Sequence, residues 1–424
     1  MSTGIVTVEK KKASVGGILA TLRLSDLALA FYIFTTVVFN EGVLISMISK
    51  VVLLVITLGE CVARRRSPVN GFMVAALLFF GWSVASLSWS TVPEESVSRI
   101  KTFLYQLICY GCVSALVIND KRALKVSLVA FVLSSIVSAF VVLGVLGITF
   151  TDNRSTSGVV SSGQLALTVA FSMMLCLYSW KKTRHSRYLV LFFGLAFALL
   201  LTSARRDFII LLIFFILFSS MGSKDIRKRV GLFVVCLLVV VGVVLAVLNV
   251  DFLYQFIGRR LESFAQFVIW GGSGDASTTG RARLIAYGMG LFQGAPFTGN
   301  GVGTFEALFT TTHGSWQTSA DNNYVELLAD LGIVGFLLYY IPLAIFLIRN
   351  LRGITSASLE KQFAVSGVIA FAAIDFACVW FFSKSGMLII LYFYLMTKPL
   401  VSGRDSVSDT ARDCLPSEKG YENE

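Results

Sequence analysis

Long apolar runs separated by short polar segments dominate the chain. Twelve runs can be laid out, at residues 24–39, 43–60, 70–89, 102–118, 126–148, 161–180, 188–202, 208–221, 230–249, 323–348, 361–382 and 386–400. About 20 apolar residues in a helix span the hydrocarbon core of a bilayer. The pattern therefore predicts an all-α polytopic membrane protein with about 12 transmembrane helices. The second run, which carries Lys50, and the short seventh run are candidates for tilted or re-entrant segments.

Composition excludes a soluble protein. Of the 424 residues, 56% are hydrophobic and only 14% are charged, whereas soluble domains carry about 25% charged residues. The first apolar run follows a long polar stretch, and no small-residue cleavage site comes after it. We therefore expect that run to be a membrane helix and not a cleaved signal peptide.

Lys and Arg are distributed unevenly between alternate loops. If the N-terminus is cytoplasmic, 25 of the 36 fall inside, ten fall outside and Lys50 is unassigned. Cytoplasmic loops are enriched in Lys and Arg, so both termini are expected inside a bacterial inner membrane. The segments are then a cytoplasmic tail 1–23, helices one to nine in 24–249, a periplasmic loop 250–322, helices ten to twelve in 323–400 and a cytoplasmic tail 401–424.

The net charge of +11 is explained by this topology together with attraction to anionic membrane lipid. No basic groove interleaved with aromatic residues is visible, so we expect no nucleic-acid partner. The seven cysteines fall in predicted helices or cytoplasmic segments, so we predict no structural disulfide. Cys109 and Cys112 lie within an apolar run. They are expected to pack there and not to bind a metal, because no second pair of metal-ligand residues accompanies them.

The predicted outer side carries an unusual basic set. Eight of its ten members are Arg: Arg99, Lys101, Arg154, Arg205, Arg206, Arg259, Arg260, Arg281, Arg283 and Lys384. Arg forms planar two-point contacts that suit phosphate and carboxylate. The set indicates an anionic ligand at the outer membrane surface, although contact with lipid headgroups and salt bridges is the alternative for any single member. Arg205 and Arg206 stand between two apolar helices, where charge is costly and is commonly functional.

The predicted outer loop reads as alternating helical and turn-rich parts. These are an amphipathic helix over 254–270, a linker over 271–280, a helix over 281–292 with Arg281 in its first turn, a glycine-rich loop over 295–304 and a polar stretch over 310–322. The spacing Gly299-x-Gly301-x-Gly303 is a weak nucleotide-binding signal, because no strand precedes it and no Gly-Lys-Ser/Thr follows. A tight turn that fixes the loop against the bilayer is the better interpretation.

Three motifs occur in a fixed order. They are Thr202-Ser203-Ala204-Arg205, then Gly280-Arg281 through Pro296-x-x-Gly299-x-Gly301-x-Gly303-x-Phe305, then Asp321-Asn322-Asn323-Tyr324-x-Glu326-Leu327-Leu328-x-x-Leu331-Gly332-x-x-Gly335. Together they resemble the superfamily of O-antigen ligases and Wzy-type O-antigen polymerases, strongly from Gly280 to Gly335, moderately at Arg205 and elsewhere only in layout. That resemblance implies a helical, GT-C-like membrane glycosyltransferase with a long outer loop between helices nine and ten.

The resemblance also implies a chemistry. An undecaprenyl-pyrophosphate-linked glycan would place its pyrophosphate at the outer surface, held by Arg205 and Arg281, with Arg206 and Arg283 as further binding candidates. An acceptor hydroxyl attacks the anomeric carbon and the lipid pyrophosphate leaves. Arg contacts stabilise the charge that develops on a departing phosphate. No metal or other cofactor is needed on this interpretation.

The chain departs from the ligase pattern in one place. Ligases resemble one another in a His-Asn pair just before the tenth helix, and this chain has Asp321-Asn322 there. The Asp321 carboxylate is a candidate general base for the acceptor hydroxyl, and its alternative role is a helix cap. The Asp-Asn pair favours polymerase over ligase. His313 would replace the missing His if the loop folds back, and otherwise it is a solvated loop residue.

Further residues are candidates for contacts with sugar. Asn322 and Tyr324 are placed to shape a sugar site, and Trp316 offers a flat ring either to a sugar or to the membrane surface. The outer acids Glu94, Glu95 and Asp152 either line an acceptor groove or are solvated. Asp375, within an apolar run, either pairs with Lys384 or a site Arg, or belongs to a structural polar network.

The sequence thus predicts a polymerase of lipid-linked oligosaccharide repeat units for O-antigen, capsule or exopolysaccharide. The alternatives are a ligase that moves the glycan onto lipid A–core or protein, and a transporter or flippase. A transporter is less favoured because the two halves show no repeat and the site lies at one surface. The expected partners are the undecaprenyl-pyrophosphate-linked glycan and membrane lipid, with a chain-length regulator as a further candidate.

Overall fold

A computed structural model describes residues 22–39, 43–64, 69–118, 120–146, 162–201, 206–221, 276–313 and 319–398, with isolated residues between 225 and 234. Its elements are α2 (Leu24–Val38), α3 (Leu44–Arg64), α4 (Gly71–Ala85), η1 (Ser86–Ser88), α5 (Pro93–Val117), α6 (Lys121–Leu146), α7 (Ser162–Thr183), α8 (Arg187–Leu201), α9 (Arg206–Ser220), α13 (Ala276–Gly294), α14 (Thr304–His313), α15 (Asn323–Leu351), η3 (Ile354–Ser356), α16 (Leu359–Ile374) and α17 (Lys384–Met396).

Within these residues, six helices are long and apolar enough to cross a membrane: Leu44–Ala63, Gly71–Ser88, Pro93–Val117, Lys121–Val141, Gly163–Thr183 and Asn323–Leu351. Four shorter apolar helices accompany them, at Leu24–Val38, Arg187–Leu199, Asp207–Ser220 and Lys384–Met396. The protein is therefore a helical, polytopic membrane protein. The predicted amphipathic helix over 254–270 lies outside the described residues, as does all of the predicted helix over 230–249 except residues 230, 231 and 234. The count of 12 therefore stays a prediction.

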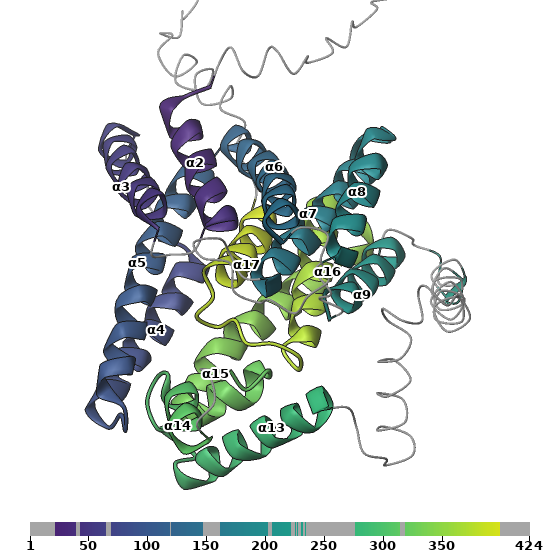
Figure 1. The fold of residues 1–424 in the computed structure, drawn as a ribbon. Coiled ribbons are helices and arrows are strands. Elements are labelled where there is room, and N and C mark those ends of the chain that lie inside the picture. The colour runs from purple at the N-terminus through teal and green to yellow at the C-terminus, as the bar shows by residue number, and fades with distance from the viewer. Residues whose placement is uncertain are drawn as a thin grey trace, which may run out of the picture.

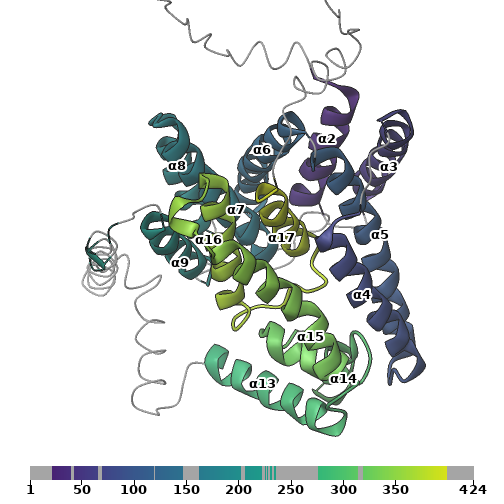
Figure 2. The ribbon, with the colours of Figure 1, turned by 180° about the vertical axis from the view of Figure 1, so that it is seen from behind.

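Helix α17 lies at the centre of the bundle. Nearly all of its residues are buried, including Leu388, Tyr392 and Phe393. It packs against α2, α5, α7 and α16, while α2 contacts α3 and α6, and α16 contacts α9. Figures 1 and 2 show α13 and α14 together beyond one end of this bundle, against the start of α15.

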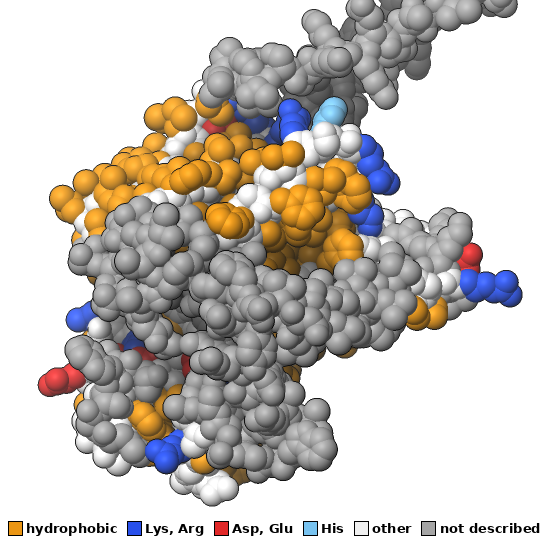
Figure 3. Space-filling view, turned by 45° about the vertical axis from the view of Figure 1, so that its right-hand side comes forward, with side chains coloured by type: hydrophobic (Ala, Val, Ile, Leu, Met, Phe, Trp, Pro, Cys, Tyr) orange, Lys and Arg blue, Asp and Glu red, His pale blue; other side chains and the backbone are white. Residues whose placement is uncertain are grey.

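The outer surface of the bundle is apolar. Helix α3 alone exposes Leu44, Val51, Val55, Leu58 and Val62. Figure 3 shows hydrophobic side chains covering the upper part of one face. In water such a surface would drive association, whereas lipid tails solvate it well.

Ion pairs join residues that the loop count assigns to one side of the membrane. On the predicted cytoplasmic side, Arg23 bonds Asp120 at 2.9 Å and Lys182 bonds Glu360 at 2.6 Å. On the other side, Arg99 bonds Glu306. The contacts agree with the alternation of loops, and which side faces the cytoplasm stays a prediction.

Several helix boundaries differ from those expected, those of α5, α16 and α13 among them. Helix α5 begins at Pro93 and not at 102, because Pro at the first position and acidic residues in the first turn favour a helix start there. Helix α16 ends at Ile374 and not at 382. Helix α13 begins at Ala276, so the linker predicted over 271–280 is wrong for its last five residues, and Arg281 lies in the second turn and not the first.

Candidate functional site

The glycine-rich loop between α13 and α14 interlocks with a kink in α15. Gly332 breaks the helix with φ +64°, and Ile333 N then donates to Pro296 O at 2.9 Å. In return Gly301 N donates to Asp330 O at 2.8 Å. A Cβ on Gly299 would lie 2.3 Å from Asp330 O, so the backbones touch where only glycine fits. The predicted tight turn is confirmed. The loop is fixed against α15, whereas the bilayer was the expected partner.

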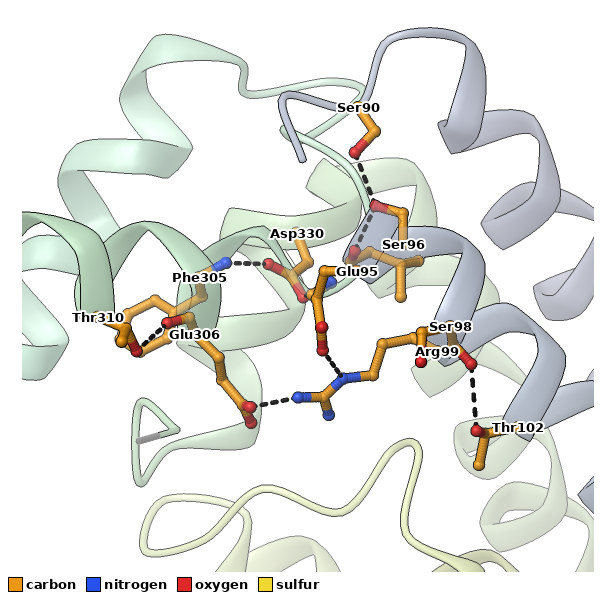
Figure 4. A network of polar contacts seen from close by, with 12 residues as sticks. Ser90, Glu95, Ser96, Ser98, Arg99, Thr102, Phe305, Glu306, Thr310 and Asp330 are labelled. Carbon is orange, nitrogen blue, oxygen red and sulfur yellow. Dashed lines mark hydrogen bonds and ion pairs between the residues drawn. The ribbon is translucent and has the colours of Figure 1, made fainter. Parts of the chain in front are cut away.

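Buried polar side chains complete this joint. Asp330 is 1% exposed, and its carboxylate accepts from Gly303 N at 2.7 Å and Phe305 N at 2.9 Å, at the start of α14 (Figure 4). The Asn300 amide donates to Leu291 O at 3.0 Å and Ala329 O at 2.9 Å. The loop therefore fixes the end of α13 and the start of α14 on α15.

The joint brings together two of the predicted catalytic residues. Arg281 Nε on α13 donates to Asp321 Oδ2, just before α15, at 3.3 Å. The Arg281 side chain is 51% exposed and that of Asp321 is 34% exposed, so an incoming ligand can reach both. These residues are 40 positions apart in the chain, and their meeting depends on the loop between α13 and α14.

Asp321 adopts an unusual backbone conformation. Its φ of +50° lies in the left-handed region, which Asp and Asn tolerate better than most residues. The following residue, Asn322, is the N-cap of α15, and its side chain accepts from Val325 N at 3.1 Å. The alternative in which Asp321 caps this helix is therefore wrong, because the cap position is one residue later.

A buried carboxylate holds the segment that carries Asp321. Glu326 is 4% exposed, and its Oε2 accepts from Ala320 N at 2.7 Å. With the Asn322 cap on the other side, the backbone is fixed both before and after Asp321. The carboxylate of Asp321 is thus presented next to the start of α15, where the helix dipole is positive.

The other predicted site residues are placed as follows. Tyr324 donates its hydroxyl to Ala372 O at 2.7 Å and stacks on Tyr340 at 4.9 Å, so it has a structural role, as Asn322 has. Arg283 is exposed on α13, and two residues along a helix correspond to about 200°, so it points away from Arg281. The contacts with substrate predicted for these residues stay predictions.

Four predicted site residues lie wholly or partly outside the described part of the structure. Arg205 and Trp316 lie outside the described residues. Arg206 is the first residue of α9 and His313 the last of α14, and the side chains of both lie outside the described part.

An ion-pair network beside the loop was not predicted. Arg99 Nε donates to Glu95 Oε1 at 2.8 Å, and Arg99 Nη2 bonds Glu306 Oε2 (Figure 4). Glu95 is therefore an ion-pair partner in α5 and not a solvated loop acid, whereas Asp152 lies outside the described residues. The i, i+4 spacing of Glu95 and Arg99 was the available signal.

Asp375 belongs to a structural polar network. Tyr340 donates to Asp375 Oδ2 at 2.7 Å, and the Trp380 indole donates to Oδ1. Asn323 Oδ1 accepts from Trp380 N at 3.0 Å and Phe381 N at 3.2 Å. This network explains why α16 ends early: the turn before α17 is bound to the start of α15.

Residues 189–340 match a family model described as O-antigen ligase. The chain carries a domain of the O-antigen ligase and polymerase superfamily. The match runs from α8 into α15, and so includes the Arg281–Asp321 pair, the glycine loop and the kink at Gly332. It leaves out α5 and α17. A search of curated proteins finds no match.

The O-antigen ligase match agrees with the resemblance that the three motifs carry. It supports an integral membrane protein of surface-polysaccharide synthesis that uses lipid-linked glycan. It does not separate the polymerase from the ligase.

Proposed function

We propose that this protein is a glycosyltransferase that polymerises oligosaccharide repeat units linked to undecaprenyl pyrophosphate on the periplasmic side of the inner membrane. The observation that carries the proposal is the accessible Arg281–Asp321 pair inside the O-antigen ligase domain. One partner suits a phosphate and the other suits the proton of a sugar hydroxyl.

The pair is poised to open when substrate arrives. Both side chains are at least one-third exposed, and ion pairs of this kind are worth about 0–1 kcal/mol. A doubly charged pyrophosphate competes well for Arg281 and releases Asp321 at small cost. The carboxylate is then available as a base, beside the guanidinium that holds the leaving group.

The proposed reaction is a displacement at the anomeric carbon. The acceptor hydroxyl oxygen forms the new bond to this carbon and gives its proton to Asp321. The bond between the anomeric carbon and the phosphate oxygen breaks, and the lipid pyrophosphate leaves with the electron pair. Arg281 stabilises the charge that develops on the leaving oxygen.

The test is a gel of surface polysaccharide and lipid-linked glycan from a deletion strain complemented with the wild type or a variant. We expect Arg281→Ala to leave a single repeat unit on the acceptor, with no ladder. Lys125→Gln, which changes an exposed cation on α6, is the matched control and should leave the ladder intact. Full polymer from a normally expressed Arg281→Ala variant would refute the proposal.

A ligase is the second candidate, because the matched family model is described as O-antigen ligase. It predicts a different gel: glycan of normal length stays on the undecaprenyl carrier when the protein is lost. The Asp321-Asn322 pair, in place of the His-Asn of ligases, makes the polymerase our first choice. An unchanged gel together with substrate flux into proteoliposomes would favour a transporter over both.

A further inference from the structure

A cavity of about 290 Å³ lies between α5, α7 and the turn that leads into α17. Its walls include Arg99, Thr102 and Gln106 from α5, Gln164 from α7, Lys384 from α17 and Ser383 just before that helix. Since Arg99 and Gln106 are seven residues apart in one helix, the cavity extends about 10 Å along α5. At roughly 30 Å³ per water, it has room for a group much larger than a few solvent molecules.

The charged residues that line this cavity are both cations. Lys384 is 4% exposed, and its ammonium donates to Phe39 O. Because Lys384 is the first residue of α17, the positive end of that helix lies beside it. The Ser383 hydroxyl and the Gln106 amide add polar groups to the cavity wall, while the Thr102 hydroxyl donates within α5 to Ser98 O at 3.1 Å. These cations and polar groups match the oxygens of a phosphate or diphosphate.

Arg99 is held in position before any ligand binds. Glu95, one turn earlier in α5, contacts its Nε, and Glu306 in α14 contacts its Nη2 (Figure 4). A side chain that is already fixed loses little rotational freedom when a ligand arrives. The carboxylate of Glu306 also ties the cavity wall to α14, and therefore to the joint that places Arg281 and Asp321.

The cavity is lined by neither member of the Arg281–Asp321 pair. The cavity nevertheless lies near the start of α15. In the turn before Lys384, the backbone N–H groups of Trp380 and Phe381 donate to Asn323 Oδ1. Three helices of the bundle surround the cavity, two of them among the long apolar helices. A ligand that carries phosphate on a lipid tail fits this position at the end of the bundle.

We propose that this cavity binds the phosphate groups of a second lipid, the diphosphate of the lipid-linked acceptor glycan. The choice of acceptor rests on the proposed function, since a polymerase joins two lipid-linked glycans and releases only one carrier. The phosphate chemistry rests on the cavity alone. An anionic phospholipid headgroup is the other source of the same chemistry, and the experiment separates the two.

The test measures binding to the purified full chain in nanodiscs of phosphatidylcholine, with undecaprenyl diphosphate as the probe and native mass spectrometry as the readout. The wild type should bind two molecules per chain. Lys384→Gln should bind one and weaken the affected site at least about tenfold, since hydrogen bonds to charged groups contribute about 1.5–3 kcal/mol. Lys384→Arg should restore the second molecule, and Lys125→Gln should behave as wild type.

Two further comparisons make the outcome specific. Arg281→Ala should also bind one molecule, and the double variant Arg281→Ala with Lys384→Gln should bind none. A failure of the catalytic proposal and a failure of the cavity proposal therefore give different numbers of bound molecules. Phosphatidylglycerol that displaces the Lys384-dependent molecule at equal concentration would support the phosphate site and assign it to bulk lipid. Unchanged binding by Lys384→Gln, with an unchanged melting temperature, would overturn the proposal.

Discussion

The conformation of Asp321 decides how its chemistry can be tested. Asn and Asp both tolerate the left-handed backbone conformation, whereas Ala would add backbone strain there. Asp321→Asn therefore removes the charge and the base while keeping the shape of the segment. Alanine at this position would combine two effects that could not be separated.

We expect Asp321→Asn to lower the rate of glycosyl transfer by about 10²–10⁴-fold, the usual contribution of a general base. The melting temperature should change little, because the exposed pair with Arg281 contributes little to stability. Transfer from purified lipid-linked repeat units, together with a melting curve, provides the check. A rate within a few-fold of wild type would leave Asp321 no role as a base.

Two buried carboxylates on α15 support this residue and its surroundings. Glu326 binds the backbone at Ala320, and Asp330, one helical turn later, binds the backbone at Gly303 and Phe305. Buried backbone N–H groups are costly without acceptors. Acids in an apolar segment are commonly functional, and the fold shows that these two accept from loop amides.

At the scale of elements, the kink in α15 and the glycine loop form one unit. Each supplies backbone groups that the other satisfies, as in Asn300 N to Ala329 O at 3.1 Å and Val334 N to Phe297 O at 3.3 Å. The broken helix turn therefore leaves fewer unpaired groups than its position in a membrane helix would suggest. The unit positions α13, and with it Arg281.

Gly299→Ala and Gly332→Ala should each destabilise the protein by roughly 2–4 kcal/mol and reduce transfer, because a Cβ would overlap backbone atoms at 2.3 Å and 2.4 Å. Gly290→Ala is the matched control. Gly290 lies within α13 with open space around it, so alanine there should be neutral or stabilise by about 0.4–1 kcal/mol. Thermal unfolding in detergent measures all three, and equal melting temperatures would contradict the proposed packing.

At the scale of the whole molecule, the bundle has an end that carries the loop unit and an opposite end with its own ion pairs. The loop unit is joined to the Arg99 network through the Arg99–Glu306 ion pair, and Arg99 also lines the cavity. The positive-inside pattern predicts that the end that carries the loop unit faces the periplasm.

A membrane-impermeant maleimide tests that orientation. Phe297→Cys replaces a side chain that is 71% exposed on the loop unit, and His185→Cys replaces an exposed residue at the opposite end. In intact cells with a permeabilised outer membrane, we expect labelling above the level of the unmodified chain at position 297 only, and at both positions after lysis. Labelling of position 185 alone before lysis would reverse the topology.

The local pattern of apolar residues was enough to predict most of the described helices, including α2, α8 and α9 within about two residues. A membrane helix satisfies its own backbone, so its existence depends on its own sequence. The glycine motif likewise indicated a turn, and the order of the three motifs indicated the superfamily. Helix ends such as that of α16 were less predictable, because Asp375 stops the helix through partners on α15 and in the turn before α17.

Whether Arg281 meets Asp321, and which residue caps α15, depended on tertiary structure, since the glycine loop must first dock on the kink at Gly332. The cavity with Arg99 and Lys384 is also invisible in the sequence, where these residues are 285 positions apart. Which charged side chains lie close together depends on how the helices pack, and not on their spacing along the chain. The sequence alone thus determined a helical membrane protein and predicted an Arg-rich outer side, and the packing of its helices decided which partners the described cations contact.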